Sequence, residues 1–255
     1  MLGSAGDAAA RALRAELGIG DAPIPDLRTL IRNREDLVLV ERSLSGELDG
    51  AYAYDDHIRR GFIYLNAKPI WTRRRFTMAH ELGHHTLAHR QRVDQNVFEL
   101  NGDPSEIEAN AFAAELLMPA SGLRTAPRVH EASDVAELAA YYLVSGRAMV
   151  VRLHALRIID SPFRRHLEET YDPKFYASFL DSDPPDRRDV SRTSLPQQFV
   201  DAVITLYTSG AITFDAAREA LDISPNEAQE MLPAVSDDED LLRRANSGVS
   251  VEDGV

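Results

Sequence analysis

Two histidines, His80 and His84, lie four residues apart in the segment His80-Glu-Leu-Gly-His84. On a helix this spacing puts both imidazoles on one face, where they can bind a single metal ion. Glu81 is rotated by about 100° from His80 around the helix, so its carboxylate lies beside the metal and not on it. A carboxylate in that place can take a proton from metal-bound water and act as a general base. The segment therefore predicts a zinc site with hydrolytic chemistry.

The histidine-bearing helix also needs a buried face. Phe76, Ala79, Gly83 and Leu87 follow helical spacing next to the histidines. A glycine within a helix costs up to about 1 kcal/mol relative to alanine, so we expect another side chain to pack closely against the backbone at Gly83.

Two histidines do not complete a catalytic zinc site, which usually takes three protein ligands and a water molecule. A third histidine of the metzincin pattern is excluded, because Leu87 and Arg90 stand where that pattern needs glycine and histidine. On a continuous helix, His85 and His89 would point well away from the metal-binding face. We therefore expect a carboxylate from a second helix.

That second helix is predicted to begin at the N-cap Asp103, with Pro104 in its first position, and to end before Pro119. Its buried stripe comprises Ala109, Phe112, Ala113, Leu116 and Leu117. By the helical step per residue, Glu106 lies about 50° from the centre of this stripe and Glu108 about 110° from it. Glu106 is the predicted third ligand, and Glu108 is the alternative.

Two other roles stay open on the second helix. Glu106 also has the position of a capping-box glutamate that bonds back to the backbone of Asp103. Asn110 is a candidate for orienting a metal ligand through a hydrogen bond.

Residues 75–84 and, about two dozen residues later, residues 106–119 together resemble the ImmA/IrrE family of zinc metallopeptidases. The resemblance covers roughly residues 60–120. It implies a compact zincin-like α+β fold. Together with the elements that the residues predict, this gives a small antiparallel sheet beside the HExxH helix and the glutamate-bearing helix, followed by a C-terminal helical, helix-turn-helix-like extension.

The resemblance also implies site residues and a substrate class. Zinc, with manganese as the alternative, would be held by His80, His84 and Glu106, and Glu81 would be the catalytic base. Family members are implied to cleave a helix-turn-helix repressor, or to act beside one, and so to release genes of mobile elements or stress responses. An oxyanion donor besides the metal is expected, and the sequence does not choose among Tyr52, Tyr54, Tyr64, His85 and His130.

Composition limits the class of protein. The 255 residues carry a formal net charge of −13, which argues against a dominant phosphate-binding surface, so direct nucleic-acid binding is not expected. The absence of cysteine excludes disulfides and Cys-ligated zinc and fits a reducing compartment. Neither an apolar signal region nor a run of about 18 apolar residues is present, so we expect a cytoplasmic protein without membrane contact.

Apolar spacing predicts short helices near residues 7–17 and 25–31. Three β-rich runs at residues 37–40, 51–54 and 62–65 predict the small antiparallel sheet. The third run leads into the HExxH helix, so it could lie over that helix and offer its edge to an extended peptide, or be a plain edge strand.

We expect residues 1–160 to form the metallopeptidase domain and to end in a helix pair, at residues 134–157, that is spaced like a helix-turn-helix. Arg147, Arg152 and Arg157 of this pair could face phosphate. In so acidic a chain, packing of the pair on the catalytic core is the favoured interpretation.

The remainder is predicted to contain three parts. Residues 161–194 are a connecting segment and linker, residues 195–235 are a small three-helix unit, and residues 236–255 are an acidic tail without fixed structure.

Two functions are consistent with this sequence. One is an endopeptidase of narrow specificity, and the other is a non-cleaving protein that sequesters a repressor or an antitoxin. The intact set of His80, Glu81, His84 and Glu106 favours the peptidase, because a binding module needs no base beside a metal. Direct DNA binding is a third interpretation, and it predicts an affinity that falls steeply with salt.

Overall fold

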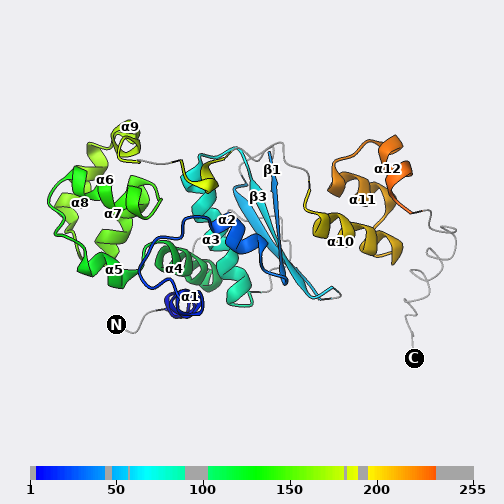
Figure 1. The fold of residues 1–255 in the computed structure, drawn as a ribbon, viewed down its shortest axis with the longest axis horizontal. Coiled ribbons are helices and arrows are strands. Elements are labelled where there is room, and N and C mark those ends of the chain that lie inside the picture. Colours follow the sequence, from blue (N-terminus) through cyan, green and yellow to red (C-terminus); the bar gives the residue numbers. More distant parts are fainter. Residues whose placement is uncertain are drawn as a thin grey trace, which may run out of the picture. The chain divides into compact units, whose positions relative to one another are not determined.

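The computed structural model describes residues 4–43, 48–56, 58–89, 103–180, 183–188 and 195–233, whose helices and strands are shown in Figure 1. The chain divides into two compact units, residues 1–193 and residues 194–255. The predicted acidic tail at residues 236–255 lies outside the described residues.

The first unit contains a mixed sheet of three strands. These are β1 (Leu37–Arg42), β2 (Gly50–Asp55) and β3 (Arg60–Asn66), in the order β1-β3-β2. β3 pairs parallel to β1 and antiparallel to β2, so the prediction of a purely antiparallel sheet is wrong for β1. The unbroken burial of β1 from Leu37 to Glu41 gives the reason, since strands in parallel pairs are commonly covered on both faces.

The strand order also corrects the predicted edge. Residues 62–65 belong to the central strand β3, and β2 forms the edge on that side of the sheet. β2 folds back onto β3 as a hairpin in which Asp55 pairs with Arg60, and among the described residues no strand pairs with the other side of β2. Any extended peptide that joins this edge would therefore pair with β2.

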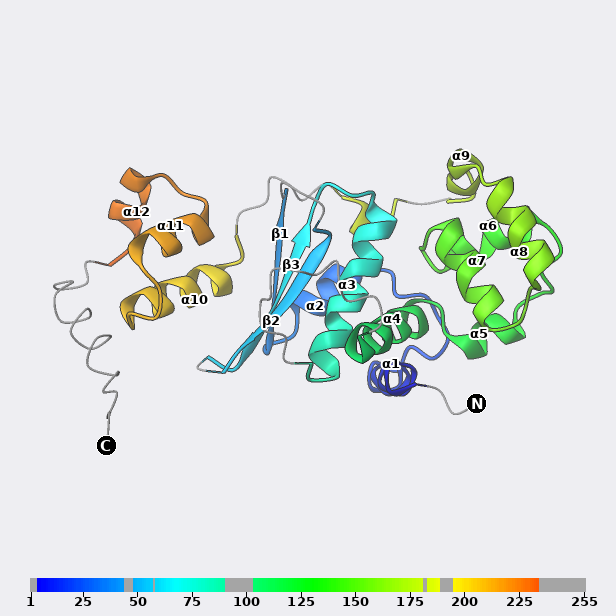
Figure 2. The ribbon, with the colours of Figure 1, turned by 180° about the vertical axis from the view of Figure 1, so that it is seen from behind.

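Four helices complete the core around this sheet: α1 (Ala5–Glu16), α2 (Leu27–Arg32), α3 (Trp71–Thr86) and α4 (Pro104–Leu117). α3 packs against β2, β3 and α4, and α4 packs against α1 (Figure 2). α3 carries the paired histidines, so the sheet and α4 together fix the position of the predicted metal site.

The predicted packing of α3 on α4 is confirmed. α4 begins after its N-cap Asp103, and all members of its predicted stripe are fully buried, namely Ala109, Phe112, Ala113, Leu116 and Leu117. A Cβ atom at Gly83 would lie 3.0 Å from Cδ1 of Phe112, so the ring packs directly against the glycine backbone. The absence of a side chain at Gly83 lets the two helices approach each other at the metal site.

α1 and α4 approach each other closely at Gly6. A Cβ atom at Gly6 would lie 2.0 Å from the backbone oxygen of Glu108 and 2.8 Å from the backbone nitrogen of Phe112. Gly6→Ala must therefore move the two helices apart, and we expect it to lower the free energy of unfolding by about 1–3 kcal/mol. Urea denaturation followed by circular dichroism measures the change. Ala8→Ser on the exposed face of α1 is the control, with an expected change below about 0.5 kcal/mol.

A buried carboxylate joins the short helix η2 (Pro185–Arg187) to the same core. Asp186 is fully buried and accepts hydrogen bonds from the backbone N–H groups of Leu27 and Arg28, each at 3.1 Å. It also forms an ion pair with the guanidinium of Arg75 on α3, which is 1% exposed. This contact ties the start of α2 and the first half of α3 together.

The first unit ends in further helices: α5 (Ala120–Thr125), α6 (Ala132–Tyr141), α7 (Gly146–Ala155), α8 (Ser161–Glu169) and α9 (Pro173–Ala177). α6 and α7 correspond to the predicted helix pair. Val135 and Ala139 of α6 and Met149 and Leu153 of α7 belong to the hydrophobic cluster that also contains the core of α3 and α4. The pair therefore shares the hydrophobic cluster of the core, and Arg152 of α7 forms an ion pair with Glu115 of α4, which agrees with the favoured interpretation.

For this region the structure excludes one alternative and corrects one prediction. Arg152 does not face phosphate, because it is 8% exposed, pairs with Glu115 and donates a hydrogen bond to a backbone oxygen. Residues 161–180 are not a plain connection, because α8 and α9 contribute Leu167 and Tyr176 to the hydrophobic cluster. Their prolines lie in the first turns of α8 and α9, where proline starts a helix and does not interrupt the fold.

The second unit contains α10 (Gln197–Thr208), α11 (Phe214–Leu221) and α12 (Pro225–Met231), the three helices that the sequence predicts there. The capping box of Ser224 and Glu227 is present at the start of α12. Their apolar faces form a small cluster of their own, which includes Val203, Ala217, Leu221 and Ala228. No helix in the described parts of either unit is long and apolar enough to cross a membrane.

Candidate metal centre

Two histidines of α3 and one glutamate of α4 converge on a single point. Nε2 of His80 lies 3.0 Å from Nε2 of His84. The carboxylate oxygens of Glu106 lie 3.1 Å from Nε2 of His80 and 3.2 Å from Nε2 of His84. In a tetrahedral zinc site with bonds of about 2.0–2.2 Å, ligand atoms are about 3.3–3.6 Å apart. The three donor groups therefore have nearly the separation that one metal ion needs.

A hydrogen bond on the far side of His80 determines which ring nitrogen carries the hydrogen. Nδ1 of His80 lies 3.1 Å from the amide oxygen Oδ1 of Asn110, which is an acceptor, so Nδ1 is the donor. In the neutral imidazole, Nε2 then has a lone pair directed at the cluster. Asn110 thus has the geometry predicted for a residue that orients a metal ligand.

These groups fit a divalent cation. The lone pair of His80 Nε2 and the oxygens of Glu106 are all acceptors, and they face one another at close range. Acceptors this close repel one another unless a proton or a cation lies between them. Two imidazoles and a carboxylate are also a donor set of catalytic zinc sites.

The pKa values of the two histidines shift in opposite directions. Burial opposes the charging of His80, but the hydrogen bond that its protonated Nε2 donates to Glu106 and the nearby charge of Glu81 together raise its pKa. Burial, aided by the charge of His80, lowers the pKa of His84 to about 4. His84 is therefore neutral at pH 7, and one of its ring nitrogens is available to a metal.

Glu81 lies beside the cluster, is 5% exposed and faces the start of β2. A Cβ atom at Gly50 would lie 3.0 Å from Oε1 of Glu81, so the glycine leaves room for the carboxylate. Burial raises the pKa of Glu81 to about 7; the charge of His80 opposes this shift and that of Glu106 adds to it. A carboxyl group with such a pKa can both take and return a proton near neutral pH.

His85 is engaged away from the cluster, as predicted. Its Nδ1 lies 3.0 Å from the hydroxyl of Tyr52, and its Nε2 lies 2.9 Å from Oδ2 of Asp36. The ring of Tyr52 stacks on that of His84 with a centroid distance of 6.5 Å. Of the predicted oxyanion donors, Tyr52 therefore lies next to the cluster, with its hydroxyl held by His85.

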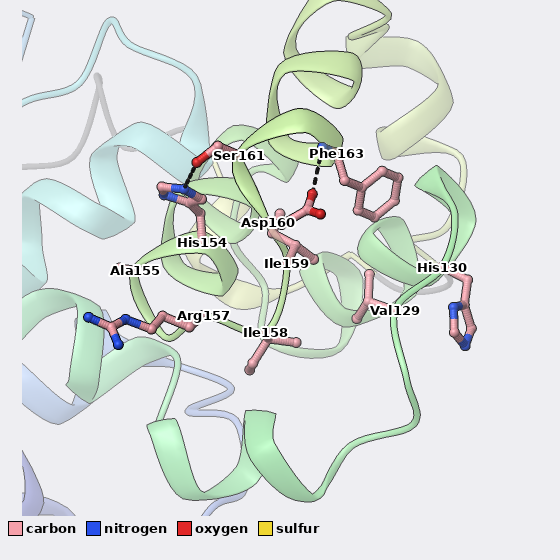
Figure 3. Close-up of a pocket in the computed structure, with 10 residues that line it drawn as sticks. All are labelled: Val129, His130, His154, Ala155, Arg157, Ile158, Ile159, Asp160, Ser161 and Phe163. Atoms are coloured by element: carbon pink, nitrogen blue, oxygen red, sulfur yellow. Dashed lines mark hydrogen bonds between the residues drawn. The ribbon is translucent and has the colours of Figure 1, made fainter.

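His130, another predicted oxyanion donor, lies elsewhere. It lines a cavity of about 890 Å³ together with His154 and Ser161, and none of the three donor residues of the cluster lines that cavity (Figure 3). His154 Nε2 lies 3.0 Å from the hydroxyl of Ser161. Asp160, however, accepts from the backbone N–H of Phe163 as the N-cap of α8, so this is not a serine–histidine–aspartate triad.

His89 lies against His84, which contradicts the prediction for a continuous helix. α3 ends at Thr86, and Ala88 adopts a left-handed conformation with a φ of 55°. The backbone N–H groups of Ala88 and His89 donate to the carbonyl oxygens of His85 and His84, at 3.1 and 2.9 Å, as in a Schellman motif. The sequence does not indicate this turn, because the usual signal is a glycine at the left-handed position, and here that position is Ala88.

Ala88 provides a stability prediction. A non-glycine residue in the left-handed region costs roughly 1–2 kcal/mol. Since glycine has more chain entropy to lose, we expect Ala88→Gly to raise the free energy of unfolding by about 0.5–1 kcal/mol. Ala8→Gly within α1 should lower it by a similar amount. Urea denaturation of both variants tests this, and a destabilised Ala88→Gly protein would contradict it.

Comparison with known proteins places this site in a family. Residues 32–154 match the model of the Peptidase M78 family, described as the IrrE N-terminal-like domain. This part of the chain is a member of the Peptidase M78 family. The resemblance to ImmA/IrrE metallopeptidases is thereby confirmed, and the matched residues include the sheet, all three donor residues, α6 and α7 except its last residue. Membership supports a peptidase that uses a metal ion.

Two individual proteins are similar to parts of the chain. The uncharacterized immunity region protein 2 of Bacillus phage phi105 is 37% identical over 81 residues, which are 30% of this chain and 49% of that protein. A solved structure of a Mycobacterium tuberculosis transcriptional regulator has 20% identity and a TM-score of 0.41, over 58% of this chain and 46% of that one. The chain thus spans about half the length of each of these proteins.

Proposed function

We propose that the protein is a zinc-dependent endopeptidase that cleaves a helix-turn-helix transcriptional repressor. His80, His84 and Glu106 would hold the metal, and Glu81 would be the catalytic base. The main support for this proposal is that the three donor groups converge beside the buried carboxylate of Glu81. Membership in the M78 family supports a peptidase, and the phage relative's name, an immunity region protein, supports a regulator of phage-type genes as the substrate.

The chain's own groups divide the work of peptide hydrolysis. A bound zinc ion supplies a Lewis acid that activates water and polarises the peptide carbonyl. Glu81 accepts a proton from the attacking water on its carboxylate. As the C–N bond breaks, Glu81 returns that proton to the leaving amine. Asn110 holds His80 in the orientation that directs Nε2 into the cluster.

A groove beside the cluster supports a polypeptide substrate. The groove has a volume of about 1400 Å³ and is lined by Thr77 of α3 and Asn110 of α4, which flank the metal cluster. Ile70 and Val151 also line it and are 70% and 51% exposed. Exposed apolar side chains gathered at one groove are typical of a surface that a partner covers.

The proposal is tested by incubating the zinc-loaded protein with the helix-turn-helix regulator encoded nearest its gene. We expect discrete fragments by mass spectrometry, and their loss when a chelator removes the metal. A stable complex with the regulator but no fragments, in the presence of stoichiometric zinc, would contradict cleavage and favour sequestration.

A further inference from the structure

The second histidine of the cluster, His84, is linked to a series of two further side chains that the three-ligand site does not require. Nδ1 of His84 lies 3.1 Å from Nδ1 of His89, and Nε2 of His89 lies 3.2 Å from Oε2 of Glu108. The side chains become more exposed along this series, from 1% for His84 through 14% for His89 to 37% for Glu108. A buried imidazole is thus linked to a carboxylate near the surface.

The hydrogen atoms of this series can be assigned from its outer end. An ionised carboxylate only accepts, so Glu108 requires that His89 donate through Nε2. A neutral His89 then has a lone pair on Nδ1, and the short contact to His84 requires that His84 donate through its own Nδ1. Nε2 of His84 is left with a lone pair on the side of Glu106 and His80. Glu108 therefore sets the tautomer of His84 through His89.

The backbone holds His89 in place for this contact. The turn after α3 places the N–H of His89 2.9 Å from the carbonyl oxygen of His84, so the two residues are joined through both backbone and side chain. Glu108 comes from α4, two residues after Glu106. α4 thus presents one glutamate to the metal cluster and another to the outer side of a histidine in that cluster.

We infer that His89 and Glu108 are positioning residues, which fix the orientation and the tautomer of His84 so that Nε2 is presented to a metal ion. This inference rests on the proposed metal site. It gives Glu108 a different role from the alternative ligand that the sequence allows, because its oxygen lies on His89 and not among the three converging donor groups. In this arrangement His84 is oriented by an imidazole and a carboxylate, whereas His80 is oriented by the side-chain amide of Asn110.

The test measures the affinity of the full chain for Zn²⁺ by competition with a chromogenic chelator. We expect His89→Ala to weaken zinc binding by about 10–100-fold, the range found when outer partners of metal ligands are removed. Glu108→Gln should weaken it in the same direction. The double variant should bind zinc about as weakly as His89→Ala alone, because Glu108 acts through His89. His89→Gln, whose amide oxygen can accept the bond from His84, should recover part of the affinity.

The controls separate positioning from folding. His166→Ala and Glu137→Gln make the same chemical changes at exposed positions, and both should bind zinc like the wild type. Thermal unfolding in the presence of a chelator should be alike for all variants. Wild-type zinc affinity in His89→Ala, or additive losses in the double variant, would overturn the inference alone. Absence of zinc binding by the wild type would overturn it together with the proposed function.

Discussion

Glu81→Gln is expected to lower the rate of regulator cleavage by about 10²–10⁴-fold, the usual contribution of a general base. The amide that replaces the carboxylate cannot accept the proton of the attacking water. Glu81 is not among the three converging donor groups, so zinc affinity should change little. Initial rates of fragment formation, with metal content measured on the same samples, test this prediction.

Glu106→Gln is the matched comparison. It makes the same change of carboxylate to amide at a donor residue, so it should lose zinc and cleavage together. If Glu81→Gln kept more than a tenth of the wild-type rate with full zinc, Glu81 could not be the base. If it lost zinc as Glu106→Gln does, Glu81 would have to be reassigned as a ligand.

Asp186→Ala is expected to have the largest effect on stability, with a loss of about 3–5 kcal/mol in the free energy of unfolding. The substitution leaves the guanidinium of Arg75 buried without its counter-charge. It also leaves the backbone N–H groups of Leu27 and Arg28 without their acceptor. The total free energy of unfolding of a natural domain is only about 5–15 kcal/mol, so the urea midpoint should fall by a large amount.

Asp183→Ala is the control for this measurement. Asp183 pairs with Arg187, but both side chains are more than half exposed, so the expected loss is below about 1 kcal/mol. Equal stability of Asp186→Ala and Asp183→Ala would show that the buried ion pair does not hold α2, α3 and η2 together.

Local signals allowed much of the fold to be predicted. α4 begins after the expected N-cap, Asp103, because the residues that start a helix are neighbours in the sequence and can be identified there. The packing at Gly83 follows from the cost of a glycine inside a helix. Helical geometry alone favours Glu106 over Glu108 as the third ligand, and the structure brings Glu106 to the histidines.

Other features depend on contacts that are distant in sequence or on backbone conformations without a clear signal. Arg75 and Asp186 are separated by 111 positions, so neither residue indicates the other in the sequence. The parallel pairing of β1 with β3 requires β3 to enter between two earlier strands. His89 reaches His84 only because Ala88 takes a conformation that usually belongs to glycine.

Anomalous diffraction at the zinc absorption edge, from crystals of the zinc-loaded protein, tests the proposed metal site most directly. We predict one peak per chain, within about 2.0–2.2 Å of Nε2 of His80, Nε2 of His84 and a carboxylate oxygen of Glu106. Glu108 should remain hydrogen-bonded to His89. No peak at the histidines, or a peak coordinated by Glu108 in place of Glu106, would contradict this site.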